Sequence, residues 1–210
     1  MRCALVVIAK APAPGRSKTR LTPPCTPGEA ALLAGAALHD TLEAVAATPA
    51  ARRVCVLDGE PGAWLPPGIE VIAQRGGGLD ERLAHAFGDV GEPALLIGMD
   101  TPQVTPALLD AAGEDLQRPD VDAVLGEAPD GGYWAIGLRE ADPALLRGVP
   151  MSTPSTCACQ RARLNAHGLR VGELAPLRDV DDIADARAVA RLAPHGRFAR
   201  ALATVEGRLG

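Results

Sequence analysis

Aromatic side chains are scarce in this chain of 210 residues, of which they supply only 2%. Hydrophobic residues still make up 47% of the sequence, so the core must be built from alanine, valine, leucine and isoleucine. Single-stranded nucleic acids are commonly bound by stacking on aromatic rings, and few are present. The formal net charge of −5 also lacks the basic excess typical of proteins that bind nucleic acids or membrane surfaces.

Long apolar runs and paired cysteines are missing as well. No apolar run approaches the roughly 20 residues that cross a bilayer, and the N-terminus shows no signal-peptide pattern, so a cytoplasmic location is expected. The five cysteines are scattered without a Cys-x-x-Cys pair, which favours free structural thiols over a metal or redox site. The four histidines show no metal-ligand spacing and are expected to be surface or packing residues.

Lysine is almost absent, because only two of the 21 lysine and arginine residues are lysines. Both Lys10 and Lys18 lie in residues 10–20, directly after an apolar run, and no acidic residue precedes Glu29. Lysine provides a compact, rotatable point charge where arginine provides a rigid fork. We call residues 10–20 the basic loop and interpret it as a candidate phosphate-binding site. The alternative is an ordinary solvated loop.

Apolar runs alternate with helical patterns along the chain, which is typical of an α/β fold with a mainly parallel sheet. The predicted strands lie near residues 5–9, 54–57, 69–73, 94–97, 121–125 and 169–174. Helices are predicted near residues 27–47, from the glycines at 76–78 to 88, and near 106–117, 154–167, 183–193 and 195–208. No repeat or linker interrupts this pattern, so a single domain over residues 1–210 is predicted.

Two stretches that follow predicted strands have properties of ligand sites. The glycines at 76–78 allow a ligand to approach the backbone at a helix start, although a flexible connector has the same composition. Asp100 follows the strand near 94–97, at the position where open α/β sheets place ligand and metal groups.

Two acidic stretches lie further along the chain. Asp130-Gly131-Gly132 is either part of a site or a plain hairpin turn, for which Asp-Gly is a strong signal. Asp179 and Asp181 point to the same side of an extended segment, so one can reach a metal while the other orients it. The alternative is an ordinary acidic helix start.

Taken together, five segments resemble the DUF2064 family of glycosyltransferase A-like (GT-A-like) proteins, which is related to the guanylyltransferases of molybdenum cofactor and of phospholactate. The segments are residues 9–21, 77–82, 97–102, 129–133 and 179–181, within a resemblance that extends from about residue 4 to 190. The chain departs from the family where Asp80 replaces a usual glycine. It departs again at residues 182–186, which read Asp-Ile-Ala-Asp-Ala instead of Thr-Pro-Glu-Asp-Leu.

The resemblance implies a single-domain, Rossmann-like GT-A fold with a mainly parallel sheet, a nucleotide over the basic loop and Mg²⁺ or Mn²⁺ as cofactor. The metal would bind to Asp100 and Asp181, with Asp179 as the alternative to Asp181. The residues expected to be catalytic are Lys18, Arg20 and Asp100. The nucleotide and its phosphates would bind to Lys10, Gly15, Arg16, Lys18, Arg20, Gln74, Gly77, Gly78 and Arg82. The acceptor would bind to Asp130, Gly131, Gly132 and Tyr133.

Two chemistries are compatible with these residues. A nucleotidyltransferase would move a nucleotide from an NTP to a small phosphate or phosphonate acceptor, and a glycosyltransferase would use a nucleotide-diphospho-sugar. The dense cations of the basic loop favour nucleotidyl transfer, because leaving pyrophosphate carries more charge. A third hypothesis is an inactive nucleotide-sensing or partner-binding domain. Small molecules are the expected partners, without nucleic acid or membrane, and monomer and homodimer both stay open.

Overall fold

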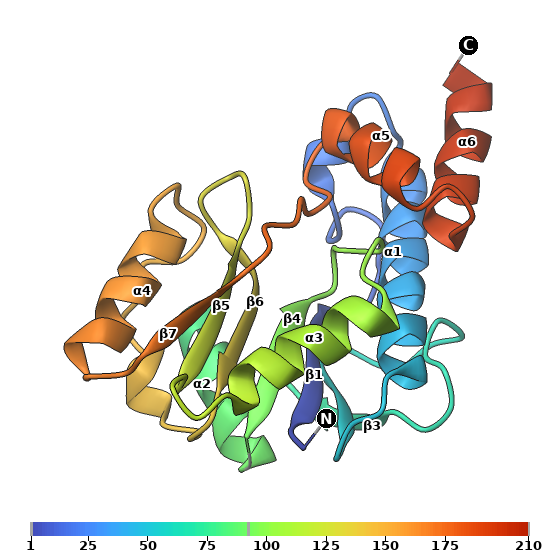
Figure 1. The fold of residues 1–210 in the computed structure, drawn as a ribbon. Coiled ribbons are helices and arrows are strands. Elements are labelled where there is room, and N and C mark those ends of the chain that lie inside the picture. The colour runs from blue at the N-terminus through green and yellow to red at the C-terminus, as the bar shows by residue number, and fades with distance from the viewer. Residues whose placement is uncertain (1, 92, 210) are drawn as a thin grey trace.

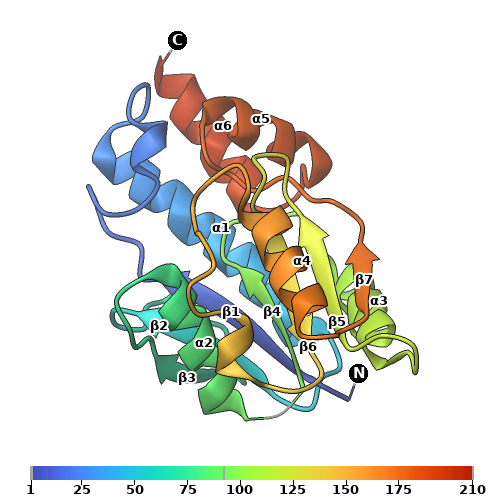
Figure 2. The same cartoon turned by 90° about the vertical axis from the view of Figure 1, so that its left-hand side faces the viewer.

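Helices cover both faces of a seven-stranded sheet in the computed structural model, which describes residues 2–91 and 93–209 (Figures 1 and 2). The strands are β1 (Ala4–Lys10), β2 (Arg53–Asp58), β3 (Glu70–Ala73), β4 (Ala94–Gly98), β5 (Ala123–Glu127), β6 (Tyr133–Leu138) and β7 (Val171–Leu174). Their order is β3-β2-β1-β4-β6-β5-β7. β6 runs antiparallel to β4 and β5, whereas the other neighbours are parallel. The predicted α/β fold with a mainly parallel sheet is confirmed.

The helices pack in two layers and one additional pair. They are α1 (Pro27–Ala47), α2 (Leu79–Val90), α3 (Pro106–Gln117), α4 (Thr156–Ala166), α5 (Ile183–Leu192) and α6 (Arg197–Leu209), with the short 3₁₀ helices η1 (Thr19–Leu21) and η2 (Pro143–Leu145). α1 and α3 cover one face of the sheet, and α2 and α4 cover the other (Figure 2). α5 and α6 pack against α1 at the C-terminal end of the chain.

The central strand β1 contributes to both cores. Because successive side chains of a strand point to opposite faces, Leu5 and Val7 pack under α1 and α3, whereas Ala4 and Val6 pack under α2 and α4. None of the four is more than 1% exposed. Burial on both faces explains why the sequence of this strand is continuously apolar.

The predicted start of α1 is confirmed in detail. The Thr26 hydroxyl oxygen accepts a hydrogen bond from the Glu29 main-chain N at 3.2 Å, and the Glu29 carboxylate accepts one from the Thr26 main-chain N at 2.8 Å. The expectation that no segment is long and apolar enough to cross a membrane is wrong by length and composition, because α1 meets both criteria. However, 61% of its most apolar 18-residue stretch is buried inside the fold, and a core helix passes the same test.

A third hydrophobic cluster joins the end of the basic loop to the C-terminal helices. Leu21 of η1, Val180 and Phe198 of α6 are all buried in it. Asp40 of α1 fixes the start of α6, since its carboxylate accepts hydrogen bonds from the main-chain N atoms of Arg197 and Phe198 at 3.0 and 2.8 Å. The end of the basic loop and the C-terminal helices, which are distant in sequence, therefore pack in one hydrophobic cluster beside α1.

The cysteines agree with the prediction of structural thiols. No disulfide joins them in the described part of the chain, and Cys25, Cys55 and Cys157 are buried. Burial raises the pKa of the Cys55 thiol to about 12, so this group stays protonated and unreactive near neutral pH.

Candidate functional site

A cavity of about 580 Å³ opens at the carboxyl ends of β1 and β4, and its walls include Lys10, Asp100 and Tyr133. A neighbouring cavity of about 230 Å³ shares Lys10 and Asp100 with it and is also lined by Lys18. Open α/β sheets usually bind ligands at this edge, and the larger volume is typical of small-molecule sites.

Most of the predicted site residues lie at these cavities. The larger cavity is lined by Lys10, Arg20, Gln74, Arg82, Asp100, Asp130, Gly132, Tyr133 and Asp181. Arg16 and Lys18 line the smaller one. Four predicted glycines line neither cavity: Gly15, Gly77, Gly78 and Gly131.

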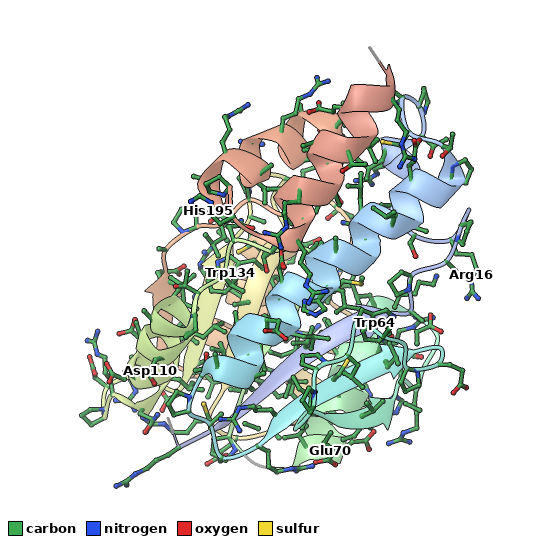
Figure 3. The ribbon with its side chains drawn as sticks, turned by 90° about the vertical axis from the view of Figure 1, so that its right-hand side faces the viewer. Arg16, Trp64, Glu70, Asp110, Trp134 and His195 are labelled. Atoms are coloured by element: carbon green, nitrogen blue, oxygen red, sulfur yellow. The ribbon has the colours of Figure 1, made fainter. Side chains whose placement is uncertain are left out.

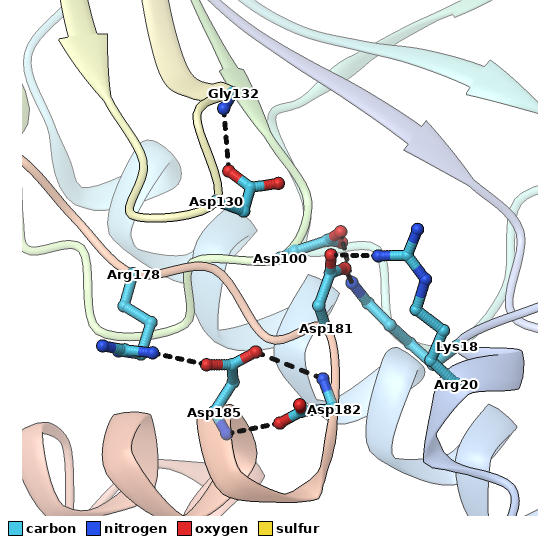
Figure 4. Close-up of polar contacts among 9 residues, drawn as sticks. All are labelled: Lys18, Arg20, Asp100, Asp130, Gly132, Arg178, Asp181, Asp182 and Asp185. Carbon is cyan, nitrogen blue, oxygen red and sulfur yellow. Dashed lines mark hydrogen bonds and ion pairs between the residues drawn. The ribbon is translucent and has the colours of Figure 1, made fainter. Parts of the chain in front are cut away.

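Lys18 lies between two carboxylates that the sequence assigns to a metal. Its Nζ is 2.5 Å from Asp100 Oδ2 and 3.4 Å from Asp181 Oδ1 (Figure 4). The Lys18 side chain is only 11% exposed. Burial by itself lowers the pKa of Lys18, but the charges of Asp100 and Asp181 outweigh burial and raise it above its ordinary value. The ammonium is therefore charged at neutral pH and links the basic loop to both carboxylates.

Arg20 makes a second contact between the basic loop and Asp181. Its Nη1 lies 2.7 Å from Asp181 Oδ2, so the basic loop engages both oxygens of this carboxylate. The Arg20 side chain is 70% exposed, unlike that of Lys18. Arg20 can consequently move to a ligand at a smaller cost in desolvation.

The tip of the basic loop is exposed, although its base is fixed. The buried Ser17 hydroxyl oxygen accepts a hydrogen bond from the Ala13 main-chain N at 3.1 Å. Gly15 adopts a φ of 72°, which favours glycine, and its α-carbon faces open space. Arg16 follows at the tip, where its exposed side chain extends outward from the rim of the smaller cavity (Figure 3). Gly15 therefore shapes the loop without lining a cavity.

Three carboxylates meet beside this contact. Asp130, Asp179 and Asp181 each place an oxygen atom within 4.8 Å of the others. Burial, and then the charges of Asp181 and Asp130, raise the pKa of Asp179 to about 6. The sequence analysis assigned Asp130 to the acceptor, but the structure also brings it into this acidic group.

The chemistry of these donors fits a hard divalent cation. Mg²⁺ and Mn²⁺ prefer carboxylate oxygens, and the acidic group provides them from Asp130, Asp179 and Asp181. Asp100 Oδ1 is buried and has no hydrogen-bond partner in the described part of the chain. An unsatisfied buried carboxylate oxygen is costly unless a ligand completes it.

Gln74 holds two strands together at the cavity wall. Its Nε2 donates to the carbonyl oxygens of Ala9 and Val56 at 2.6 and 3.1 Å, and its Oε1 accepts from Arg82 at 3.3 Å. The amide that the sequence analysis assigned to the nucleotide is therefore already engaged with the protein.

Asp58 is a residue that the sequence analysis missed. Its Oδ2 lies 3.2 Å from Arg82 Nη1 and 4.0 Å from Lys10 Nζ, so it orients two cations of the cavity. The signal that identified Asp100, an aspartate at the carboxyl end of a predicted strand, also applies to Asp58.

The glycines before α2 have local structural roles. The Gly77 main-chain N donates to the Glu81 carboxylate at 2.7 Å, and Gly78 is the residue that caps α2. Neither glycine lines the larger or the smaller cavity. Asp80, the departure from the family pattern, accepts a hydrogen bond from the Gly148 main-chain N at 2.8 Å. Its charge is therefore directed to the segment after η2.

The Asp130 segment is both a hairpin turn and part of the cavity. It joins β5 to β6, and the Asp130 carboxylate accepts a hydrogen bond from the Gly132 main-chain N at 2.8 Å. Gly131 has a φ of 86°, and a Cβ there would lie 2.0 Å from the Pro154 carbonyl oxygen. Gly131 is thus required by packing against Pro154 and does not line the cavity.

Further residues of the cavity were not singled out from the sequence. Thr101 is 1% exposed, and its hydroxyl has no hydrogen-bond partner among the described residues. Residues 151–154 and Thr156 also line the cavity. The sequence analysis interpreted this stretch only as a helix start; α4 in fact begins at Thr156, and residues 151–154 are left to line the cavity.

Solved structures with a similar fold define the class. A proposed nucleotide-diphospho-sugar transferase from Desulfovibrio desulfuricans G20 is 28% identical with a TM-score of 0.83, over 98% of this chain and 94% of that one. The 2-C-methyl-D-erythritol 4-phosphate cytidylyltransferase from Thermus thermophilus is 19% identical with a TM-score of 0.58, over 92% and 100%. CMP:2-keto-3-deoxy-manno-octonic acid synthetase, complexed with CTP, is 13% identical with a TM-score of 0.57, over 92% and 99%. The fold is that of the GT-A-like transferases.

The family follows from the sequence match. The family described as "Uncharacterized protein conserved in bacteria (DUF2064)" matches residues 33–153, which is more than half of the chain. The chain therefore belongs to the DUF2064 family, as the sequence resemblance implied. The basic loop and Asp181 lie outside the matched residues. A comparison with curated proteins gives no match.

The two lysines provide a matched test of the contact at Lys18. Lys18→Met leaves Asp100, which is half-buried and whose Oδ1 is fully buried, without its cation, so we expect the free energy of unfolding to fall by about 1–3 kcal/mol. Lys10→Met removes a lysine that is 40% exposed and 4.0 Å from Asp58, and should cost less than about 1 kcal/mol. Urea denaturation measures both losses. Equal losses would contradict the different environments of the two lysines.

Asp179 should make stability depend on pH when metal is removed with EDTA. Its folded pKa of about 6 exceeds its ordinary value of 3.8, so the folded state binds the proton more tightly and stability falls as pH rises from about 4 to 6. Asp179→Asn abolishes this titration. The difference in free energy of unfolding, variant minus wild type, should therefore rise by about 1–2 kcal/mol between pH 4 and pH 7.5, after allowance for partial solvent exposure. Thermal denaturation measures the difference, and a difference independent of pH would contradict the assignment.

Proposed function

We propose that the protein is a transferase that uses a nucleotide donor and depends on a divalent metal. The observation that carries the proposal is the contact of Lys18 and Arg20 with Asp100 and Asp181 at the ligand-binding edge of the sheet. The cations suit the phosphates of a nucleotide, and the carboxylates suit the metal that accompanies those phosphates. The two neighbouring cavities therefore provide cations for the phosphates of such a ligand and carboxylates for its metal ion.

Phosphate groups compete with the carboxylates for the loop cations. When a nucleotide binds, Lys18 and Arg20 exchange Asp100 and Asp181 for phosphate oxygens, and Arg16 at the loop tip adds a further cation. The carboxylates of Asp100 and Asp181 would then be free to hold Mg²⁺ or Mn²⁺, with Asp179 beside them. When bound, the metal neutralises phosphate charge and orients the phosphates.

Nucleotidyl transfer from an NTP is the preferred reaction. The donor would lose pyrophosphate, and the cations that line the smaller cavity, Lys10, Arg16, Lys18 and Arg20, would neutralise the charge that develops on it. In-line displacement at phosphorus depends mainly on positioning and charge, so no protein nucleophile is needed.

Glycosyl transfer is the second candidate. It is favoured by the likeness to the Desulfovibrio protein, whose proposed activity is nucleotide-diphospho-sugar transfer. A nucleotide-diphospho-sugar would place its diphosphate against the same cations, and the leaving group would be a nucleoside diphosphate.

A thermal-shift screen of NTPs and nucleotide-sugars, with and without Mg²⁺, tests the proposal. We expect at least one donor to raise the Tm only when Mg²⁺ is present, because a ligand that binds the folded state stabilises it. Stabilisation by NTPs favours nucleotidyl transfer, and stabilisation by nucleotide-sugars alone favours glycosyl transfer. Absence of any shift would contradict the proposal and favour a partner-binding domain.

Asp100→Asn should remove the Mg²⁺-dependent part of this shift and lower affinity for the metal–nucleotide complex by about tenfold or more. The matched control is Asp120→Asn, because Asp120 is exposed and pairs with Arg118 away from both cavities. It should retain the full shift. The same Mg²⁺ dependence in both variants would exclude Asp100 as a metal ligand.

A further inference from the structure

Charges are distributed unevenly around the larger cavity. Its lining cations are Lys10, Arg20 and Arg82, which come from the basic loop and α2. A second part of the lining consists of Tyr133, Trp134, residues 151–154 and Thr156, and none of these side chains is charged. We call this part the acceptor wall, because the lining cations suit the donor phosphates.

Hydroxyl groups are concentrated on the acceptor wall. Thr153 Oγ1 lies 3.1 Å from Ser155 Oγ and 3.3 Å from Thr156 Oγ1. The Tyr133 hydroxyl contacts the Met151 sulfur at 3.9 Å, and a thioether is a weak acceptor. The buried Thr101 hydroxyl, which also lines the cavity, has no hydrogen-bond partner in the described residues. Hydroxyls that can both donate and accept suit a ligand that carries hydroxyls itself.

The acceptor wall is held rigidly against the Asp130 turn. A Cβ on Gly131 would lie 2.0 Å from the Pro154 carbonyl oxygen, so the two segments are in close contact. The Cys157 main-chain N also donates to the Gly131 carbonyl oxygen at 2.8 Å. Ser152 adopts a φ of 57°, which is unusual for a residue with a side chain and requires support from its surroundings. The wall is therefore held in place by the protein itself.

The acidic group makes this end of the cavity negative once Lys18 and Arg20 have moved from Asp181 to the donor phosphates. Asp130, Asp179 and Asp181 lie within 4.8 Å of one another, and a single divalent cation would leave them with a net negative charge when all three are ionised. A phosphate on the acceptor would face these carboxylates without a cation from the acceptor wall. Like charges in this position disfavour an anionic acceptor.

We propose that the acceptor is an uncharged polyhydroxyl compound, a sugar or a polyol, rather than the phosphate or phosphonate expected from the sequence. The inference rests on the proposed nucleotide-dependent transfer. The acceptor lies against Tyr133, Thr153 and Thr156, which exchange hydrogen bonds with its hydroxyls. One acceptor hydroxyl oxygen bonds to the α-phosphorus of the NTP as the bond to pyrophosphate breaks, and its proton passes to water. With a nucleotide-sugar, the same oxygen bonds to the anomeric carbon and a nucleoside diphosphate leaves.

Matched pairs of neutral and phosphorylated compounds test the proposal. Glycerol and glycerol 3-phosphate, ribose and ribose 5-phosphate, and glucose and glucose 6-phosphate are titrated by NMR into the full chain with Mg²⁺ and a stabilising nucleotide. In at least one pair, the neutral member should bind about tenfold or more tightly than its phosphate ester. Tighter binding of the ester in every pair, or no binding of any neutral member, would overturn the proposal.

A charge variant sharpens this test. Met151→Lys places a cation on the acceptor wall and should shift the preference toward the phosphorylated members by about tenfold. Leu192→Lys is the matched control, because Leu192 is 67% exposed on α5 and lines neither cavity. It should leave the preference unchanged, and an unchanged preference in Met151→Lys would also overturn the proposal. Failure of the acceptor proposal can be distinguished from failure of the proposed function. In the second case the protein would bind no nucleotide even without an acceptor.

Discussion

The site depends on the contacts of the Lys18 ammonium with two carboxylates. This ammonium joins the basic loop to Asp100, 82 residues away, and to Asp181, 163 residues away. Without a cation between them, these carboxylates would repel each other at the edge of the sheet. Burying such charges is costly, but each oxygen contact with the ammonium offsets part of that cost. The arrangement holds two distant segments in place at the carboxyl ends of the strands.

The rest of the fold supports this contact from two sides. The parallel strands β1 and β4 bring Lys10 and Asp100 to one edge, where the sheet exposes its carboxyl ends. The cluster around Leu21, Val180 and Phe198 supports the other side, because it packs the end of the basic loop and the Asp181 segment against α1 and α6. The residues that match the DUF2064 family include Asp100, but the basic loop and Asp181 lie beyond them. The family match therefore covers only part of the site.

Local signals predicted much of this structure, and long-range contacts did not follow from them. The starts of α1 and α5 were predicted correctly, because they are set by the capping residues Thr26 and Asp182, and capping depends on neighbours three residues away. Alternation along an extended segment correctly placed Asp179 and Asp181 together. The ion pair of Lys18 and the engagement of Gln74 with strand carbonyls depend on tertiary packing that no spacing reveals. The close contact of Gly131 with Pro154 has the same origin.

The most direct test of the exchange between carboxylates and phosphates is Mn²⁺ binding, measured by electron paramagnetic resonance with and without the nucleotide that best stabilises the protein. Phosphates that take over Lys18 and Arg20 leave Asp100 and Asp181 to the metal, so nucleotide should tighten Mn²⁺ binding by about tenfold or more. The reciprocal tightening of nucleotide binding by Mn²⁺ should have the same factor. Equal Mn²⁺ affinity with and without nucleotide would contradict the account.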